Sequence, residues 1–206
     1  MRVGIFGGGL SSLTLAQAFV NNKIYVDVIY KKLNSVIDKT RTIGISRSNV
    51  DYFNKNIINI NDIKWDLNKI EIFSDNLKNE KLINFEDNSK YLFSIIKNFK
   101  LYEKLENNLT KNKFFSKKYS KFNKNFFEKY DLVINTDYNN AITKKYFNKK
   151  IIKTYNSKAY TTIINHEKTL NNIAFQIFTK KGPLAFLPIS KYETSVVFSA
   201  HNNTVK

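Results

Sequence analysis

The chain has 206 residues, of which 42% are hydrophobic and 15% aromatic, so it can bury a core and is not an intrinsically disordered protein. It contains no cysteine, which excludes disulfides, thiolate metal sites and cysteine nucleophiles. His166 and His201 are its only histidines, so a histidine metal cage or a histidine-based catalytic triad is poorly supported.

The formal net charge is +17, and all but three of the 34 basic residues are lysines. A charge of this size attracts phosphate backbones, but base and phosphate recognition favours arginine. The lysines are also spread along the chain between asparagines. We therefore expect a solvated lysine surface and no nucleic-acid groove, with a residual attraction to anionic membrane surfaces.

The amino terminus shares features with a secretory signal, namely Arg2, an apolar stretch and the small residues Ala16 and Ala18. Three consecutive glycines interrupt the apolar stretch, and cleavage would remove the first predicted strand, so we expect no signal peptide. No run of about 18 apolar residues, the length that spans a membrane, occurs. The sequence favours a cytoplasmic protein, with or without peripheral membrane contact.

The first elements in the chain follow a β-α-β pattern. Residues 2–6 predict a buried strand, apolar residues recur at helical spacing from Leu10 to Val20, and the Val- and Ile-rich residues 25–30 predict a second strand. Polar residues 21–23 end the helix between them. The two strands are expected to be parallel, as at the start of a doubly wound domain.

The middle of the chain predicts three further features. Residues 70–73 and 82–85 are apolar and bracket a polar segment, which indicates an antiparallel excursion. Residues 92–109 carry one apolar stripe, which predicts a long helix. Residues 131–135 then predict a short buried strand that returns to the first sheet.

The carboxy-terminal part predicts an antiparallel sheet, because helical periodicity is absent there and turns separate the apolar runs. Its predicted strands are residues 159–165, 173–179, 183–188 and 195–199. The expected fold class is α/β, with a Rossmann-like dinucleotide-binding domain on a parallel sheet and a partial antiparallel β-sheet substrate domain. We assign residues 1–65 and 88–148 to the first domain, and residues 66–87 and 149–206 to the second.

A glycine-rich loop is the strongest functional signal, since four of the six glycines lie within residues 4–9. The pattern Gly7-x-Gly9-x-x-Ser12 falls between the first predicted strand and helix. A turn too tight for any Cβ there directs backbone N–H groups and the positive end of a helix dipole at one spot, where a pyrophosphate can sit. Ser12 occupies a position that usually takes Gly or Ala. The alternative is a tight β-α turn without a ligand.

The end of the second predicted strand departs from the usual dinucleotide pattern. An Asp or Glu normally binds the cofactor ribose there, roughly 20 residues after the glycines. This chain instead has Tyr30, followed by Lys31 and Lys32. The Tyr30 hydroxyl can contact a sugar, the lysines can favour the 2′-phosphate of NADP over FAD, or the ribose contact has been lost.

Three segments of the sequence together resemble one family. They are VGIFGGGLSSLTLAQAF at residues 3–19, KTRTIGIS at residues 39–46 and IAFQIFTKKGPLAFLPIS at residues 173–190. In this order they resemble the flavin-dependent hydroxylases of ubiquinone biosynthesis, within the wider family of aromatic-ring monooxygenases. The resemblance spans nearly the whole chain, and its most distinctive part is the third segment, which holds both prolines.

The resemblance implies an FAD enzyme that is reduced by NAD(P)H and uses O2 to hydroxylate an aromatic substrate, with or without a prenyl chain, in assembly with other pathway enzymes. Gly7, Gly9 and Ser12 would face the FAD pyrophosphate. Arg41 would lie close to the cofactor, where a guanidinium can bind phosphate; otherwise it is a surface arginine. Asp137 matches the family's Asp-Gly motif, with Tyr138 in place of glycine. No catalytic side chain is assigned, because the flavin carries the chemistry.

A second cofactor motif of the family, which contains Gly-Asp, has no match. The glycines after residue 9 are Gly44 and Gly182, and Ile45 and Pro183 follow them. We therefore expect a truncated chain that represents the nucleotide-binding half and part of the substrate sheet. Two alternatives remain open at this point: a non-catalytic dinucleotide-binding protein and a lysine-rich nucleic-acid binder.

Overall fold

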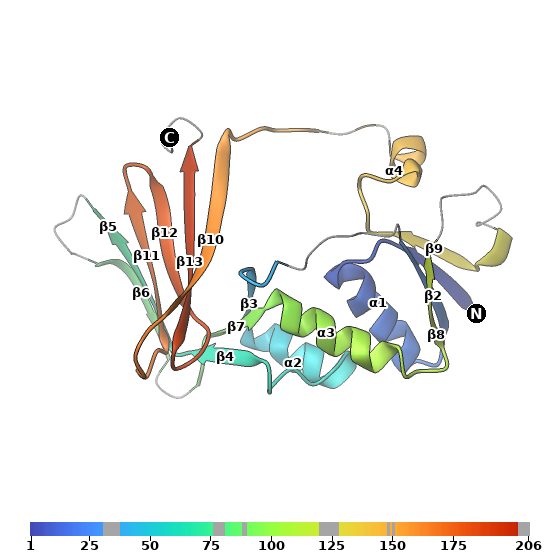
Figure 1. Cartoon of the computed structure of the whole chain (residues 1–206), viewed down its shortest axis with the longest axis horizontal. Coiled ribbons are helices and arrows are strands. Elements are labelled where there is room, and N and C mark those ends of the chain that lie inside the picture. The colour runs from blue at the N-terminus through green and yellow to red at the C-terminus, as the bar shows by residue number, and fades with distance from the viewer. Residues whose placement is uncertain are drawn as a thin grey trace. The chain divides into compact units, whose positions relative to one another are not determined.

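A computed structural model describes residues 1–30, 38–75, 81–87, 90–119, 128–147, 149 and 151–201. The chain divides into two compact units, whose elements are labelled in Figure 1. Unit 1 comprises residues 1–37, 52–59 and 100–152, and unit 2 comprises residues 38–51, 60–99 and 153–206. The predicted domain boundaries differ from this division mainly at residues 38–51, 60–65 and 88–99. They stay a prediction, since the units are defined by contacts and the domains by function.

Unit 1 is built on a four-stranded sheet with the order β8-β2-β1-β9, in which every neighbouring pair is parallel. Its strands are β1 (Arg2–Phe6), β2 (Tyr25–Tyr30), β8 (Phe115–Tyr119) and β9 (Leu132–Asn135). Val3, Ile5 and Val28 are fully buried, as expected for a parallel sheet covered on both faces. The predicted β-α-β pattern and the return of a later strand beside β1 are confirmed, whereas β8 was not predicted.

The α-helices within the described residues are α1 (Leu10–Asn21), α2 (Arg47–Asn56), α3 (Asn98–Leu109) and α4 (Ala141–Tyr146). Helix α1 connects β1 to β2, and its buried Gln17 side chain accepts a hydrogen bond from Asn108 Nδ2 on α3 at 2.9 Å. Asn21 Nδ2 donates to the carbonyl of Ile57, just after α2, at 2.8 Å. Polar side chains therefore join the three longer helices. No helix within the described ranges is long and apolar enough to span a bilayer.

The long helix predicted over residues 92–109 is wrong in its first part. Residues Phe93–Lys97 form strand β7, and the helix begins only at Asn98. Strand β7 is the central strand of a three-stranded sheet, between β3 (Thr42–Ser46) and β4 (Lys64–Leu67). Its consecutive residues Ile95 and Ile96 are both buried, so the strand lacks the alternation of a half-exposed strand and continues the apolar stripe of the following helix.

Unit 2 also contains a six-stranded sheet with the order β10-β13-β12-β11-β5-β6. Its strands are β5 (Lys69–Ser74), β6 (Lys81–Glu86), β10 (Ser157–Asn165), β11 (Ile173–Thr179), β12 (Gly182–Pro188) and β13 (Glu193–His201). The predicted antiparallel pairing of β5 with β6 and of the last four strands is confirmed. The parallel pair of β11 and β5 joins these two predicted pieces into one sheet.

A buried carboxylate ties the sheet of unit 1 together. Asp27 on β2 is 2% exposed, and its Oδ2 accepts hydrogen bonds from Arg2 Nε at 3.0 Å, Lys118 Nζ at 2.7 Å and Tyr130 Oη at 2.9 Å. Burial alone would raise the pKa of Asp27, but the hydrogen bonds and the two positive charges outweigh it and hold the pKa below its ordinary value. Folding therefore favours the ionised form of this carboxyl group.

Candidate functional site

The loop between β1 and α1 requires glycine at its first position. Gly7 has φ +123°, a backbone conformation that other residues rarely adopt. A Cβ added there would overlap Thr136 Oγ1 and would lie 3.0 Å from Ser12 Oγ. The N–H of Gly7 donates to the carbonyl of Ile29 at 2.9 Å, so the loop continues the pairing of β1 with β2 before it turns into the helix.

The amino terminus of α1 is open. Gly9 caps the helix in an extended conformation, without a side-chain cap, and apart from its chain neighbours no described residue lies within 4 Å of the position where its Cβ would be. The N–H groups of Gly9, Leu10 and Ser11 have no acceptor among the described residues, and the first turn contains no acidic side chain. Unpaired N–H groups at the positive end of a helix dipole can bind an anion.

Ser12, the third residue of the glycine pattern, is fully buried. Its hydroxyl lies 2.6 Å from Thr136 Oγ1, and Thr136 in turn donates to the carbonyl of Phe6 at 3.0 Å. Because the single Thr136 proton is directed at Phe6, the Ser12 hydroxyl is the donor of the shorter bond. The oxygen that serine adds at this position is thus satisfied within the protein, and the predicted contact of Ser12 with the diphosphate stays a prediction.

Tyr30 borders the loop with its ring. Its Cβ and Cγ would lie 3.3 Å from a Cβ at Gly8, and its ring packs against that of Tyr119 with centroids 4.5 Å apart. The Tyr30 hydroxyl is buried and makes no hydrogen bond within the described part of the chain. Burial, together with the neighbouring Tyr119 hydroxyl, raises the pKa of Tyr30. The predicted sugar contact of this hydroxyl stays a prediction. Lys31 and Lys32 lie outside the described residues.

Asp137 lies on the opposite side of the loop. Its backbone nitrogen would be 3.4 Å from a Cβ at Gly7, and its carboxylate accepts the N–H of Asn139 at 2.9 Å. Tyr138, which replaces the glycine of the expected motif, is 73% exposed and does not have a positive φ. The backbone at this position therefore accommodates a side chain without strain.

The structure brings together five of the predicted site residues within unit 1, namely Gly7, Gly9, Ser12, Tyr30 and Asp137. Arg41 belongs to unit 2, where its side chain is 70% exposed and lies 3.9 Å from Asp38. Its role toward a cofactor stays a prediction.

Thr136 is the residue of the loop that sequence reasoning missed. It directly precedes Asp137, and its hydroxyl contacts both the Ser12 hydroxyl and the carbonyl of Phe6. The sequence signal that points to Thr136 is Ser12, which stands at the third position of the glycine pattern, where Gly or Ala is usual. An additional buried hydroxyl in that place requires a hydrogen-bond partner across the turn.

No protein-family model and no curated protein matches the sequence. Solved structures match the fold over almost the whole chain. PqsL of Pseudomonas aeruginosa, described as a probable FAD-dependent monooxygenase, matches with a TM-score of 0.77 at 10% identity over 98% of this chain and 61% of its own. The p-nitrophenol 4-monooxygenase PnpA of Pseudomonas putida matches with a TM-score of 0.75 at 10% identity, over 99% and 58%.

The 2,6-dihydroxypyridine-3-hydroxylase of Arthrobacter nicotinovorans also matches, with a TM-score of 0.70 at 12% identity over 97% of this chain and 56% of its own. The chain therefore spans about three fifths of the length of the structures it matches. At this identity the similarity establishes the fold, a mixed α/β arrangement of one parallel and further antiparallel sheets that this chain shares with FAD-dependent monooxygenases.

Proposed function

We propose that this protein binds FAD by its diphosphate at the loop between β1 and α1, and that it is an FAD-dependent monooxygenase that hydroxylates an aromatic ring. The open amino terminus of α1 carries the proposal. There the free N–H groups, the unobstructed space at Gly9 and the absence of acidic side chains fit a diphosphate. The fold shared with FAD-dependent monooxygenases supports FAD as the dinucleotide.

Each loop residue has a defined part in this proposal. The N–H groups of Gly9, Leu10 and Ser11 would donate to the diphosphate oxygens. Gly7 keeps the turn tight enough for β1 and α1 to meet. The Ser12 hydroxyl holds α1 against the segment that follows β9 through Thr136. Arg41 is proposed as a further phosphate ligand on the resemblance alone.

Bound FAD, reduced by NAD(P)H, would supply the oxygen-transfer chemistry. The protein would bind the cofactor, orient the ring of the substrate and exclude water. The substrate that we propose is an intermediate of ubiquinone biosynthesis, because residues 173–190, which include β11 and β12, carry the most distinctive part of the resemblance.

A second candidate function is dinucleotide binding without turnover. The environment of Tyr30 favours this second function. Tyr30 stands where the ribose-binding Asp or Glu is expected, but its ring packs on Tyr119 and its hydroxyl is buried. A site of this kind would hold the diphosphate and bind the ribose weakly.

The test is an FAD titration of the purified protein, followed by absorbance and by the oxidation of NADH and NADPH. A stoichiometric yellow complex that bleaches with reduced nicotinamide and consumes O2 supports the monooxygenase. A yellow complex that does not bleach supports the binding protein, and a protein that binds no FAD contradicts the monooxygenase.

Two variants of Gly9 locate the site. Gly9→Asp places a carboxylate at the proposed diphosphate position, and Gly9→Asn is its neutral control of equal size. Both residues are good helix caps, so each changes the free energy of unfolding by less than about 1 kcal/mol. Gly9→Asp should weaken FAD binding at least about tenfold relative to Gly9→Asn, since like charges this close repel strongly. Equal FAD affinities of the two variants would place the diphosphate elsewhere.

A further inference from the structure

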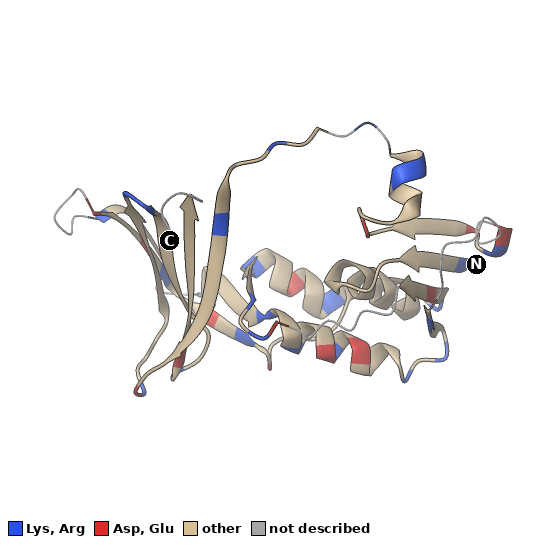
Figure 2. Ribbon diagram, turned by 45° about the horizontal axis from the view of Figure 1, so that its top comes forward, with Lys and Arg blue, Asp and Glu red and all other residues tan. Residues whose placement is uncertain are grey.

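A lysine-rich segment follows the sheet of unit 1. Between Asp137 and Glu167 the sequence contains six lysines and no acidic residue. Five of these lysines are described, and all five are exposed: Lys144, Lys145, Lys149, Lys153 and Lys158. Figure 2 shows blue bands on α4 and on the described residues after it, with no red before β10. We call the described residues within 144–158 the lysine segment.

The lysine segment also exposes large apolar side chains. Phe147 is 59% exposed, Ile151 103%, Ile152 82% and Tyr155 68%. Single exposed apolar residues are ordinary on protein surfaces, but four within nine positions of the chain indicate a segment that interacts with something else. The described residues from 147 to 156 belong to no helix or strand, so secondary structure does not account for their apolar character.

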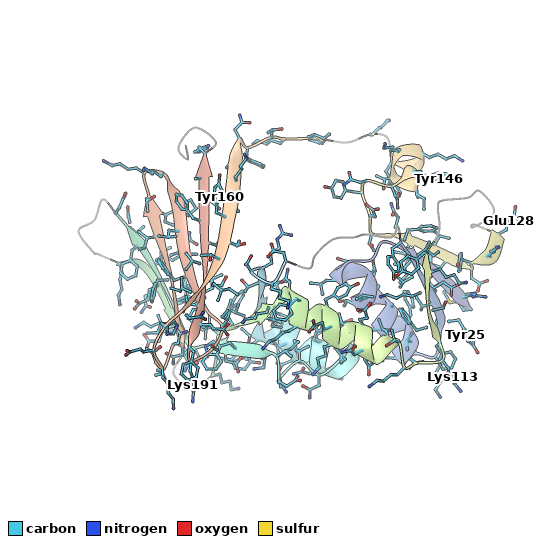
Figure 3. The ribbon with its side chains drawn as sticks, viewed as in Figure 1. Tyr25, Lys113, Glu128, Tyr146, Tyr160 and Lys191 are labelled. Atoms are coloured by element: carbon cyan, nitrogen blue, oxygen red, sulfur yellow. The ribbon has the colours of Figure 1, made fainter. Side chains whose placement is uncertain are left out.

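The start of the lysine segment is firmly attached to unit 1. Ile142 on α4 is 4% exposed and packs in a cluster with Phe6, Ile29 and Tyr130. Asn140 caps the helix and accepts the N–H of Thr143 at 3.0 Å. With Ile142 and Thr143 buried, Lys144 and Lys145 occupy the exposed side of α4. Figure 3 labels Tyr146 at the end of this helix and Tyr160 on β10, beyond the segment.

We propose that the lysine segment docks the protein on an anionic phospholipid bilayer. Each lysine near an anionic membrane surface is attracted to it, and exposed apolar side chains can enter the boundary between headgroups and acyl chains. A nucleic acid would use the lysines but not the aliphatic pair Ile151 and Ile152, because bases stack on aromatic or arginine side chains. The segment contains no arginine. This docking does not depend on the proposed flavin chemistry.

Sedimentation of the full chain with lipid vesicles tests the proposal. Binding should occur on vesicles of mixed phosphatidylcholine and phosphatidylserine, weaken with added salt, and be at least about tenfold weaker on phosphatidylcholine alone. The variant K144Q/K145Q/K149Q/K153Q should bind the mixed vesicles at least about tenfold less tightly. The variant I151S/I152S, which leaves the charge unchanged, should lose about tenfold.

A matched control removes the same charge elsewhere. Lys23, Lys55, Lys100 and Lys111 are exposed and lie outside the segment, so K23Q/K55Q/K100Q/K111Q should keep its affinity within about threefold. Circular dichroism would verify that each variant is folded. Failure to bind mixed vesicles, or equal losses from both lysine quartets, overturns the proposal. The proposal is also overturned if I151S/I152S binds the mixed vesicles as tightly as the wild type and a single-stranded RNA binds through the lysines of the segment. That combination would indicate a nucleic-acid site.

Discussion

The hydroxyl groups of Ser12 and Thr136 lie 2.6 Å apart, although 124 residues separate them in the chain. Thr136 also donates to the carbonyl of Phe6, the last residue of β1. One hydroxyl pair thus connects the end of β1, the first turn of α1 and the segment after β9. The shape of the glycine loop depends on this connection as well as on the glycines.

The two hydroxyls are expected to contribute unequally to stability. Thr136→Val leaves the buried Ser12 hydroxyl without an acceptor and should lower the free energy of unfolding by about 1–3 kcal/mol. Ser12→Ala leaves Thr136 bonded to Phe6, so its effect should be within about 1 kcal/mol. Urea denaturation of both variants and of the double variant measures this. The double variant should be more stable than Thr136→Val alone, and an additive loss would show that the hydroxyls are not coupled.

Gly7 and Gly9 should differ in their tolerance of a side chain. Gly7→Ser forces a serine to φ +123° and against Thr136, which should cost about 2 kcal/mol or more. Gly9→Ser meets open space and adds a favourable helix cap, so stability should change by less than about 1 kcal/mol. Thermal melting of the two variants side by side is the measurement. Similar melting temperatures would contradict the loop geometry.

Tyr30→Phe removes a buried hydroxyl that makes no hydrogen bond within the described part of the chain. The variant should be more stable, with a free energy of unfolding about 1 kcal/mol higher. An unsatisfied buried polar group is removed, and the ring packing on Tyr119 is retained. Its FAD affinity tests the predicted sugar contact, because an affinity within about twofold of the wild type would show that this hydroxyl does not bind the ribose. A clear loss of FAD affinity in Tyr30→Phe would instead assign the hydroxyl to the ribose.

Stability should depend on pH through Asp27. Its pKa is lowered in the folded state, so its stabilising contribution is complete above the ordinary pKa of about 3.9 and is lost as pH falls through the lower folded value. Asp27→Asn should lower the free energy of unfolding at neutral pH by about 2 kcal/mol or more, because Arg2 and Lys118 lose a charged acceptor.

The measurement is the urea midpoint of wild type and Asp27→Asn at a series of pH values down to about 3. The difference between the two proteins should shrink at the acidic end of the series. Glu103→Gln, at an exposed position on α3, removes the same charge and is the control. A difference that stays constant across the series would show that Asp27 does not titrate as proposed.

Local patterns predicted most of the fold, and they failed where a pattern had two physical meanings. Residues 94–96 are buried on successive positions, so both faces of β7 are covered there, and in the sequence they continue the apolar stripe of α3. Strand β8 was missed because its residues show no strand pattern. Lys117 and Lys118 give it no apolar alternation, and it forms because β2 offers a free edge for pairing. Lys118 then finds its charge partner in Asp27.

The amino-acid sequence by itself determined the β-α-β unit and the glycine loop. Strand and helix periods are properties of a few adjacent residues, and so is the need for glycine where the backbone turns most tightly. Only the tertiary structure decided what surrounds that loop. Strand β9 brings Thr136 to Ser12, and β8 supplies Tyr119 beside Tyr30. The physical reason is that these hydrogen bonds and ring contacts form only between strands that are neighbours in the sheet. The order of the strands depends on how the apolar residues of the whole unit are buried together, and no single segment of the sequence determines it.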